Sequence, residues 1–312
     1  MLRTLAVVAF LAGAAAARAA SADVNCTLPA AALHRFKYET FYAWHLADGG
    51  NWTNVGQSLS LELLQEFHAA TGRPSLLEVQ SLFFRPMHDV NASLQGLTIR
   101  PDWQEAWANF STSHVAPMVA RGVVTGFMLG DELVWNNITW EQLNATAAAV
   151  KASFPDCFVF YNEGGAPLYA SRNINHFHAP YPHVPAAVDF VSVDDYQPMS
   201  IRKNTEWFYR SFLYPKMLPH HRAWMVPPVF AWINATCDLA CWDTLAVTEA
   251  AAYLEWAGRD ERIVGLDGFH YASYPPHDLG LVSMPRTLAC YQALARQLIA
   301  VHHRIEASAS RP

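Results

Sequence analysis

Apolar and polar positions along the 312-residue chain follow two periods in turn. Short apolar runs rich in β-branched and aromatic residues predict buried strands, whereas apolar residues three and four positions apart predict amphipathic helices. The predicted strands cover residues 36–44, 75–85, 122–135, 157–163, 188–196, 222–232 and 263–274. The predicted helices cover residues 59–70, 103–120, 139–152, 204–217, 244–257 and 286–303. Strands and helices therefore alternate along the whole chain.

This alternation predicts a parallel α/β architecture. We expect a (β/α)8 TIM-type barrel that forms a single domain over residues 21–312, a length typical of such barrels. The eighth strand is expected within residues 46–58 or 86–100. A doubly wound open sheet is the alternative, but no glycine-rich phosphate loop opens the chain to favour it.

The segment GVVTGFMLGDELVW, residues 122–135, is the strand around which we organise the predicted site. Two carboxylates, Asp131 and Glu132, follow its apolar run, and barrel enzymes carry their chemistry at the C-terminal ends of strands. Strand alternation groups Glu132 with Gly126 and Gly130, which fit a narrow interior. We therefore expect Glu132 to face the barrel axis and Asp131 the surrounding helices. In the alternative interpretation Asp131 caps the next helix and Glu132 is a solvated loop acid.

Residues 1–20 have the features of a secretory signal peptide: a charge at Arg3, the apolar core LAVVAFLAGAAAA and small residues around the cleavage site. Seven Asn-x-Ser/Thr triplets follow, and each predicts an N-linked glycan on the surface. They begin at Asn25, Asn51, Asn91, Asn109, Asn137, Asn144 and Asn234. We expect a glycoprotein that is secreted or resides in the lumen of the secretory pathway.

Five cysteines fit disulfide formation in that compartment better than metal binding. Cys237 and Cys241 are close enough in sequence to close a local loop. An odd number leaves one thiol over, and Cys157, which opens an apolar strand, is the candidate. The sequence does not fix the remaining connectivity.

The net charge of −6 is mild, and no basic patch interleaved with aromatics indicates a nucleic-acid surface. No segment after the signal is long and apolar enough to span a membrane. Aromatic residues are abundant, with 11 Trp, 12 Tyr and 17 Phe, and such side chains stack on sugar rings when they lie in loops. The candidates for a sugar platform are Trp44, Trp232, His270 and Tyr271.

Acidic and amide side chains end several predicted strands. Cleavage of a glycosidic bond needs one protonated acid at the leaving oxygen and one ionised carboxylate near the anomeric carbon or its water. We assign Glu132 as the general acid and Asp194 as its partner, acting as base, nucleophile or electrostatic stabiliser. The expected substrate-binding residues at the same strand ends are Glu78, Asp131, Asn162, Glu163 and Tyr196. A loop-capping role for Glu163 is an equal alternative.

The segments VDFVSVDDYQP and GFMLGDE resemble strands of chitinase-type barrels, and FYNEGG resembles the Asn-Glu strand end of retaining β-glycosidase barrels. The resemblance to secreted barrel glycoside hydrolases implies a carbohydrate substrate and no cofactor. The chain departs from the chitinase pattern, which has alternate aspartates where Gly126, Met128 and Gly130 stand. It departs from the retaining pattern because neither of the last two strands ends in glutamate.

Two other function classes stay open. A metal-dependent hydrolase is suggested by His176 and His178, whose spacing suits zinc on an extended segment. Further histidines stand at His183, His220 and His221, but no acid lies at helical spacing to complete a metal site. The absence of a late glutamate leaves room for a catalytically inactive, carbohydrate-binding barrel.

Overall fold

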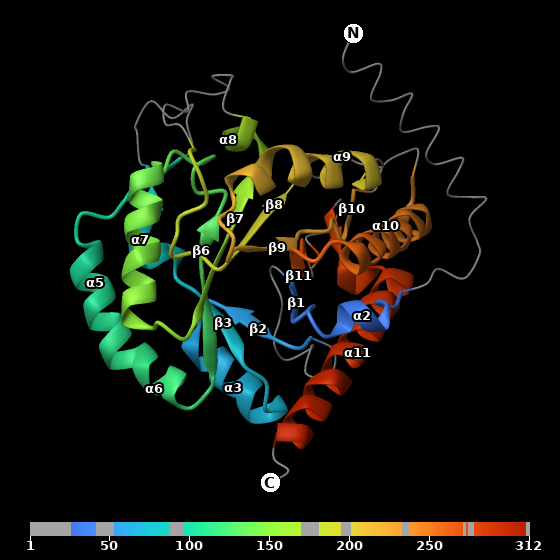
Figure 1. Cartoon of the computed structure of the whole chain (residues 1–312), viewed down its shortest axis with the longest axis horizontal. Coiled ribbons are helices and arrows are strands. Elements are labelled where there is room, and N and C mark those ends of the chain that lie inside the picture. The colour runs from blue at the N-terminus through green and yellow to red at the C-terminus, as the bar shows by residue number, and fades with distance from the viewer. Residues whose placement is uncertain are drawn as a thin grey trace. The chain divides into compact units, whose positions relative to one another are not determined.

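The structure, a computed structural model, describes residues 26–41, 53–87, 96–169, 181–194, 201–232, 237–270, 273 and 278–309. It has the predicted α/β fold of the (β/α)8 TIM-barrel class, in which eight parallel strands alternate with helices (Figure 1). The chain forms two compact units. The first unit comprises Met1–Asn54, Tyr196–Trp207 and Met225–Pro312, and the second comprises Val55–Asp195 and Phe208–Trp224.

The second unit contains five whole strands of the parallel sheet and most of a sixth. In spatial order they are β9 (Arg222–Met225), β8 (Phe190–Asp194), β7 (Phe158–Gly164), β6 (Val124–Asp131), β3 (Ser75–Glu78) and β2 (Gly56–Ser58). Its helices are α3 (Leu61–Thr71), α4 (Gln80–Phe83), α5 (Trp103–Phe110), α6 (Ala116–Ala120), α7 (Trp140–Ser153) and α8 (Gly165–Tyr169). A separate antiparallel pair joins β4 (Phe84–Pro86) to β5 (Leu97–Ile99).

Polar side chains fix the helix ends where the sequence pattern places them. The side chain of Ser60 accepts a hydrogen bond from the backbone of Leu63 at the start of α3, and Gly72 ends that helix with φ 70°. At the start of α7, Thr139 and Gln142 form a reciprocal capping box. The predicted helices over residues 59–70 and 139–152 are thereby confirmed to within a few residues.

Large aromatic rings pack beside the N-terminal halves of β6, β7 and β8. The rings of Phe160 and Trp224 stack with centroids 4.5 Å apart, and Phe190 stacks on Trp224 at 5.6 Å. A Cβ atom at Gly126 would lie 2.3 Å from the ring of Phe158. The ring of Phe158 thus occupies the space that a side chain at position 126 would need, so this position of β6 requires glycine. These rings form a densely packed aromatic cluster in the second unit.

Several predicted strands are shorter than the apolar runs that suggested them. The segment 75–85 leaves the sheet after Glu78, continues as α4 and then forms β4. The segment 222–232 is broken at Pro227 and Pro228, because proline has no N–H to donate to a ladder. Its second half, β10 (Phe230–Trp232), pairs antiparallel with β12 (Asp278–Gly280). The eighth strand is β2, inside the first of the two expected ranges.

In its described part, the first unit contains a parallel pair of strands, three whole α-helices and most of a fourth. Its elements are α2 (Ala30–Leu33), β1 (Tyr38–Phe41), most of α9 (Ile201–Phe208), α10 (Leu239–Arg259), β11 (Ile263–Gly268) and α11 (Pro285–Ala309), besides β10 and β12. Strand β1 pairs with β11 so that Thr40 lies beside Asp267. No helix in the described ranges has both the length and the apolar character needed to cross a bilayer.

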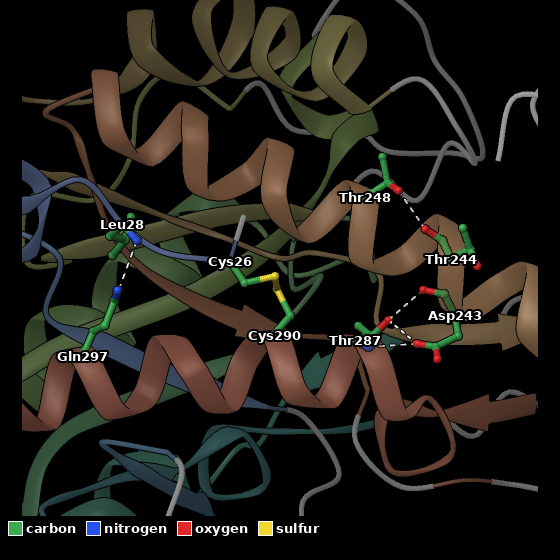
Figure 2. The surroundings of a disulfide bond; sticks show 8 residues. All are labelled: Cys26, Leu28, Asp243, Thr244, Thr248, Thr287, Cys290 and Gln297. Carbon is green, nitrogen blue, oxygen red and sulfur yellow. Dashed lines mark hydrogen bonds between the residues drawn. A yellow bond between two sulfur atoms is a disulfide. The ribbon is translucent and has the colours of Figure 1, made fainter. Parts of the chain in front are cut away.

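A disulfide joins Cys26 to Cys290, 264 residues later on α11 (Figure 2). Close to it, the backbone N–H of Leu28 donates to the side chain of Gln297 on the same helix at 3.1 Å. A second disulfide joins Cys237 to Cys241, as predicted. Cys157 is the buried free thiol, also as predicted.

The side chain of Asp243, on α10, caps the N-terminus of helix α11. The side chain of Asp243 accepts hydrogen bonds from the backbone N–H groups of Arg286 and Thr287 at 3.0 and 2.8 Å. It also accepts one from the Thr287 hydroxyl at 2.7 Å (Figure 2). Asp243 is buried, and these three donors satisfy both of its oxygens. An acid at a helix N-terminus is also favoured by the helix dipole.

Replacing both Cys26 and Cys290 by serine is expected to lower the free energy of unfolding by about 2–5 kcal/mol, because the bridge restricts a very long loop of the unfolded chain. Chemical denaturation of the wild type and the double variant measures this difference. The matched control is the Cys237→Ser, Cys241→Ser pair, whose loop is short and whose loss is expected to cost less. Equal losses for the two pairs would contradict the chain-entropy argument.

A buried acid, Glu39, lies on β1 beside Tyr291 of α11. The Glu39 side chain is 0% exposed, and neither of its carboxyl oxygens has a hydrogen-bond partner within the described part of the chain. Burial therefore raises the pKa of Glu39 well above its usual value. The acid is thus held in its neutral form in the folded protein.

The Glu39→Gln variant is expected to gain stability over the wild type as pH rises. Below about pH 4.3, Glu39 is protonated in both the folded and the unfolded wild-type chain. Above that pH the unfolded state loses the proton first, so the free energy of unfolding falls by up to about 1.4 kcal/mol per pH unit until the folded pKa is reached. Melting temperatures of both proteins from pH 4 to pH 9 test this, and parallel curves would contradict it.

Candidate active site

An irregularity near the end of β6 decides which side chains share the site. Met128 pairs with Phe160 of β7, and Asp131 pairs with Asn162, so three steps on β6 match two on β7. Such a bulge reverses the alternation of side chains beyond it. Asp131 consequently lies on the same face of the sheet as Met128. The prediction that Asp131 faces the helices is wrong, because strict alternation does not survive a bulge.

Gly130 makes the bulge possible. Its φ is 152°, in the range that favours glycine, and a Cβ atom there would lie 2.6 Å from Oε1 of Gln80 and 2.7 Å from Cδ2 of Leu133. Glu132, two residues later, has φ 49°, which is uncommon for a residue other than glycine. The backbone therefore turns sharply between Gly130 and Glu132.

A chain of hydrogen bonds orients Asp131. The Asn162 amide Nδ2 donates to Oδ1 of Asp131 at 2.8 Å, and the hydroxyl of Ser192 donates to Oδ1 of Asn162 at 2.6 Å. On its other side, the backbone N–H of Asp131 donates to Oε1 of Gln80 at 2.9 Å. Asn162 and Ser192 are both fully buried. This network presents a fixed donor to the Asp131 carboxyl group.

Glu132 lies between two other acids and is half-buried. Burial raises the pKa of its carboxyl group, and the negative charge of Asp131 raises it further. A side-chain hydrogen bond with Asp194, at the end of β8, acts in the opposite direction. Burial and the nearby charge thus favour the protonated form of Glu132, whereas the hydrogen bond with Asp194 favours its ionised form, and the net shift of the pKa is upward. The arrangement brings three carboxyl groups together at one place.

Glu78 extends the group of acids to β3. The Gln57 amide donates to its Oε1 at 3.1 Å and contacts Sδ of Met128 at 3.3 Å. Burial raises the pKa of Glu78, the hydrogen bond from Gln57 lowers it, and the charge of Asp131 raises it. Gln57 was not predicted as a site residue because β2, which carries it, is too short for alternation to show its facing side.

Glu163 is fully buried and bound to backbone. Its Oε2 accepts a hydrogen bond from the N–H of Val134 at 3.0 Å, and its Oε1 accepts from Trp135 at 3.1 Å and Gly164 at 2.9 Å. Burial raises its pKa to about 8, against the three N–H donors that lower it, and the charge of Glu132 adds to the increase. Of the two expected roles, these contacts agree with loop capping.

The remaining predicted residues do not join this group in the described part of the chain. Trp44, Tyr196 and Tyr271 lie outside the described residues. Trp232 ends β10, and only its backbone is described. His270 belongs to the first unit, where it is buried with its ring stacked 5.8 Å from that of Phe230.

The histidines considered for a metal site have other contacts. The described residues contain no group of three or more His, Cys, Asp or Glu side chains that could hold a metal ion, and His176 and His178 lie outside them. The ring of His183 packs on Trp140 at 4.8 Å, and His220 Nε2 contacts the carbonyl oxygen of Ala186 at 3.0 Å. Burial lowers the pKa of His221 to about 4, so this ring is neutral near pH 7.

No protein-family model and no curated protein sequence matches the chain. Solved structures that resemble it are glycoside hydrolases. The catalytic core of xylanase A aligns with a TM-score of 0.50 and 9% identity over 84% of this chain and 99% of its own. The FMN-binding β-glucuronidase from Facaelibacterium prausnitzii L2-6 aligns with 0.51 and 10% over 83% of this chain and 44% of its own. The GH2 β-galacturonidase from Eisenbergiella tayi aligns with 0.51 and 10% over 86% and 48%.

These comparisons show the barrel fold. The chain spans nearly the whole xylanase core but less than half of each of the two larger enzymes. At identities of 9–10% the alignments do not carry residue roles from one protein to the other. Roles for individual side chains must therefore come from the geometry of this site.

The Gly130→Ala variant is expected to lose about 2–4 kcal/mol of folding free energy, because the new Cβ adds clashes with Gln80 and Leu133 to the backbone strain. Gly122→Ala is the matched control. Gly122 also has a positive φ, 73°, but no atom lies within 4 Å of a Cβ placed there, so only the strain applies. Urea denaturation of both variants measures the difference, and equal losses would contradict the close approach at Gly130.

Proposed function

We propose that this protein is a secreted glycoside hydrolase in which Glu132 is the general acid. The observation that carries the proposal is the hydrogen-bonded pair of Glu132 and Asp194, with the fixed carboxylate of Asp131 beside it. The three acids come from the C-terminal ends of β6 and β8, where barrel enzymes perform their chemistry. A protonated acid next to ionised ones is the combination that glycosidic cleavage uses.

In this mechanism Glu132 donates its proton to the glycosidic oxygen as the bond to the anomeric carbon breaks. The sugar ring then carries positive charge, which the carboxylates of Asp131 and Asp194 stabilise. Water adds to the anomeric carbon and gives its proton to the Glu132 carboxylate, which restores the acid. A nucleophilic carboxylate would need to be about 5 Å from the acid, and a base that activates water still further away. Because Asp194 is hydrogen-bonded to Glu132, we assign it the electrostatic role among the three considered for it.

Other parts of the chain support the assignment and its cellular setting. Glu78 is half-buried near Asp131 and is proposed to bind sugar hydroxyls. Trp44, Trp232, Tyr196 and Tyr271 remain proposed substrate contacts on the basis of the sequence. Two disulfides agree with an oxidising compartment. The sequon asparagines Asn109 and Asn137 are exposed, as N-linked glycans require.

Glu132→Gln is expected to lower kcat by about 100- to 10,000-fold while substrate affinity stays within a few-fold, because the amide binds but has no acidic proton to give. The measurement is hydrolysis of a panel of aryl glycosides and oligosaccharides by the secreted protein. Glu62→Gln, an exposed acid on α3, is the control and is expected to leave kcat unchanged. The wild-type rate should fall as pH rises through the raised pKa of Glu132.

Three outcomes separate the candidate functions. Loss of turnover in Glu132→Gln with retained ligand binding supports the glycosidase. Unchanged turnover would overturn the role of Glu132. Glycan binding with no turnover by the wild type on any substrate would identify a carbohydrate-binding barrel without catalytic activity.

A further inference from the structure

The turn that follows β6 depends on a carboxyl group of the neighbouring strand. Glu163 of β7 takes three backbone N–H groups on its two oxygens, and two of these groups belong to Val134 and Trp135. Val134 is itself buried, so its N–H has no access to water if the acceptor is removed. An unsatisfied buried N–H costs about 1–3 kcal/mol. Glu163 thus stabilises the backbone two and three residues beyond Glu132.

The same turn holds Glu132 in its unusual conformation. The N–H of Glu132 donates to the carbonyl oxygen of Asn162 at 3.0 Å, and its own carbonyl accepts from the backbone and the side chain of Asn136 at 2.8 and 2.9 Å. With φ 49°, the residue is strained, and such strain persists only where surrounding contacts fix it. Residues 133–135 connect Glu132 to Asn136. The hydrogen bonds from the N–H groups of Val134 and Trp135 to Glu163 therefore fix the middle of this loop.

Trp135 packs against the same short stretch of β7. A Cβ atom at Gly164 would lie 3.2 Å from Cβ and two ring atoms of Trp135. Gly164 therefore allows the loop to approach β7 closely enough for both hydrogen bonds to Glu163. A larger residue at position 164 would push the loop away from its acceptor.

We propose that Glu163 is a positioning residue that sets the location of the Glu132 carboxyl through the backbone of Val134 and Trp135. The proposal rests on the assignment of Glu132 as the reacting acid. Glu163 does not touch the substrate, because its side chain is 0% exposed and both oxygens point at backbone N–H groups. An acid at a strand end can thus serve catalysis without reacting.

The experiment compares Glu163→Ala, which removes the acceptor, with Glu163→Gln, which keeps one acceptor oxygen in nearly the same shape. We expect Glu163→Ala to lower kcat by on the order of 100-fold with a small change in KM, since displacement of a reacting group by about 1 Å has an effect of that size. Glu163→Gln should recover part of the loss. Substitution of a group that reacts chemically would abolish turnover equally in both variants, and that result would overturn the proposal.

Titration of Glu132 supplies a readout that needs no substrate. The carboxyl carbons of glutamate, labelled with ¹³C, are followed by NMR, and the Glu132 signal is assigned by its loss in Glu132→Gln. The groups that face this carboxyl are Asp131 on its own strand, Glu163 on β7 and Asp194 on β8. In Glu163→Ala we expect the midpoint to fall toward the ordinary value of about 4.3, as the carboxyl moves into water.

Asp243→Asn is the matched control for the loss of a structural carboxylate. Asp243 also accepts two backbone N–H groups, but it lies on α10 in the first unit and caps the start of α11. It should lose stability while kcat and the Glu132 midpoint stay unchanged. If Glu163→Ala and Glu163→Gln behave like this control, the proposal is overturned. If the wild type hydrolyses no glycoside, the proposed function fails, and the Glu132 midpoint still decides whether Glu163 positions it.

Discussion

The sharp turn of backbone from Gly130 to Glu132 is the constraint on which the site depends. In a regular strand, consecutive side chains point to opposite faces, so adjacent acids cannot reach one place. Here the bulge brings Asp131 to the face of Met128, and the positive φ of Glu132 lets the next side chain approach the same acids. Without this turn the two carboxyl groups would lie on opposite sides of the sheet.

Acids held this close together repel one another. The buried hydrogen bonds of Asn162 and Ser192 beside them limit this repulsion. Asp131 has a fixed amide donor in Asn162, whose carbonyl oxygen is in turn occupied by the hydroxyl of Ser192. Burial and the charge of Asp131 raise the pKa of Glu132, and the hydrogen bond with Asp194 offsets part of that increase. Surroundings that shift the pKa values of neighbouring acids apart are how one site can hold both an acid and a carboxylate near neutral pH.

The sequence predicted the parts of the fold that depend on local patterns. Alternating periods predicted the barrel class, and amphipathic patterns predicted the two helices that Ser60 and Thr139 cap in the structure. It did not predict the end of β3 at Glu78, because the apolar run continues through α4 into β4. The three-residue strand β2 carries too little pattern to be placed alone, and Gln57 was missed with it. Such short elements are fixed by pairing with neighbours rather than by their own composition.

The site shows the same division between local and long-range information. The acids at strand ends were visible in the sequence, and so was the glycine before Asp131, which alternation placed on the inward face. What the glycine does instead depends on Gln80, fifty positions earlier, whose side chain occupies the space of a Cβ and binds the next N–H. Likewise, the Asn-Glu pair of β7 contributes through its contacts with the loop beyond β6: Asn162 holds a carboxylate and a backbone N–H, and Glu163 holds two more. A residue's type and position at a strand end indicate where a site lies, whereas its hydrogen-bond partners determine whether it reacts or supports a residue that does.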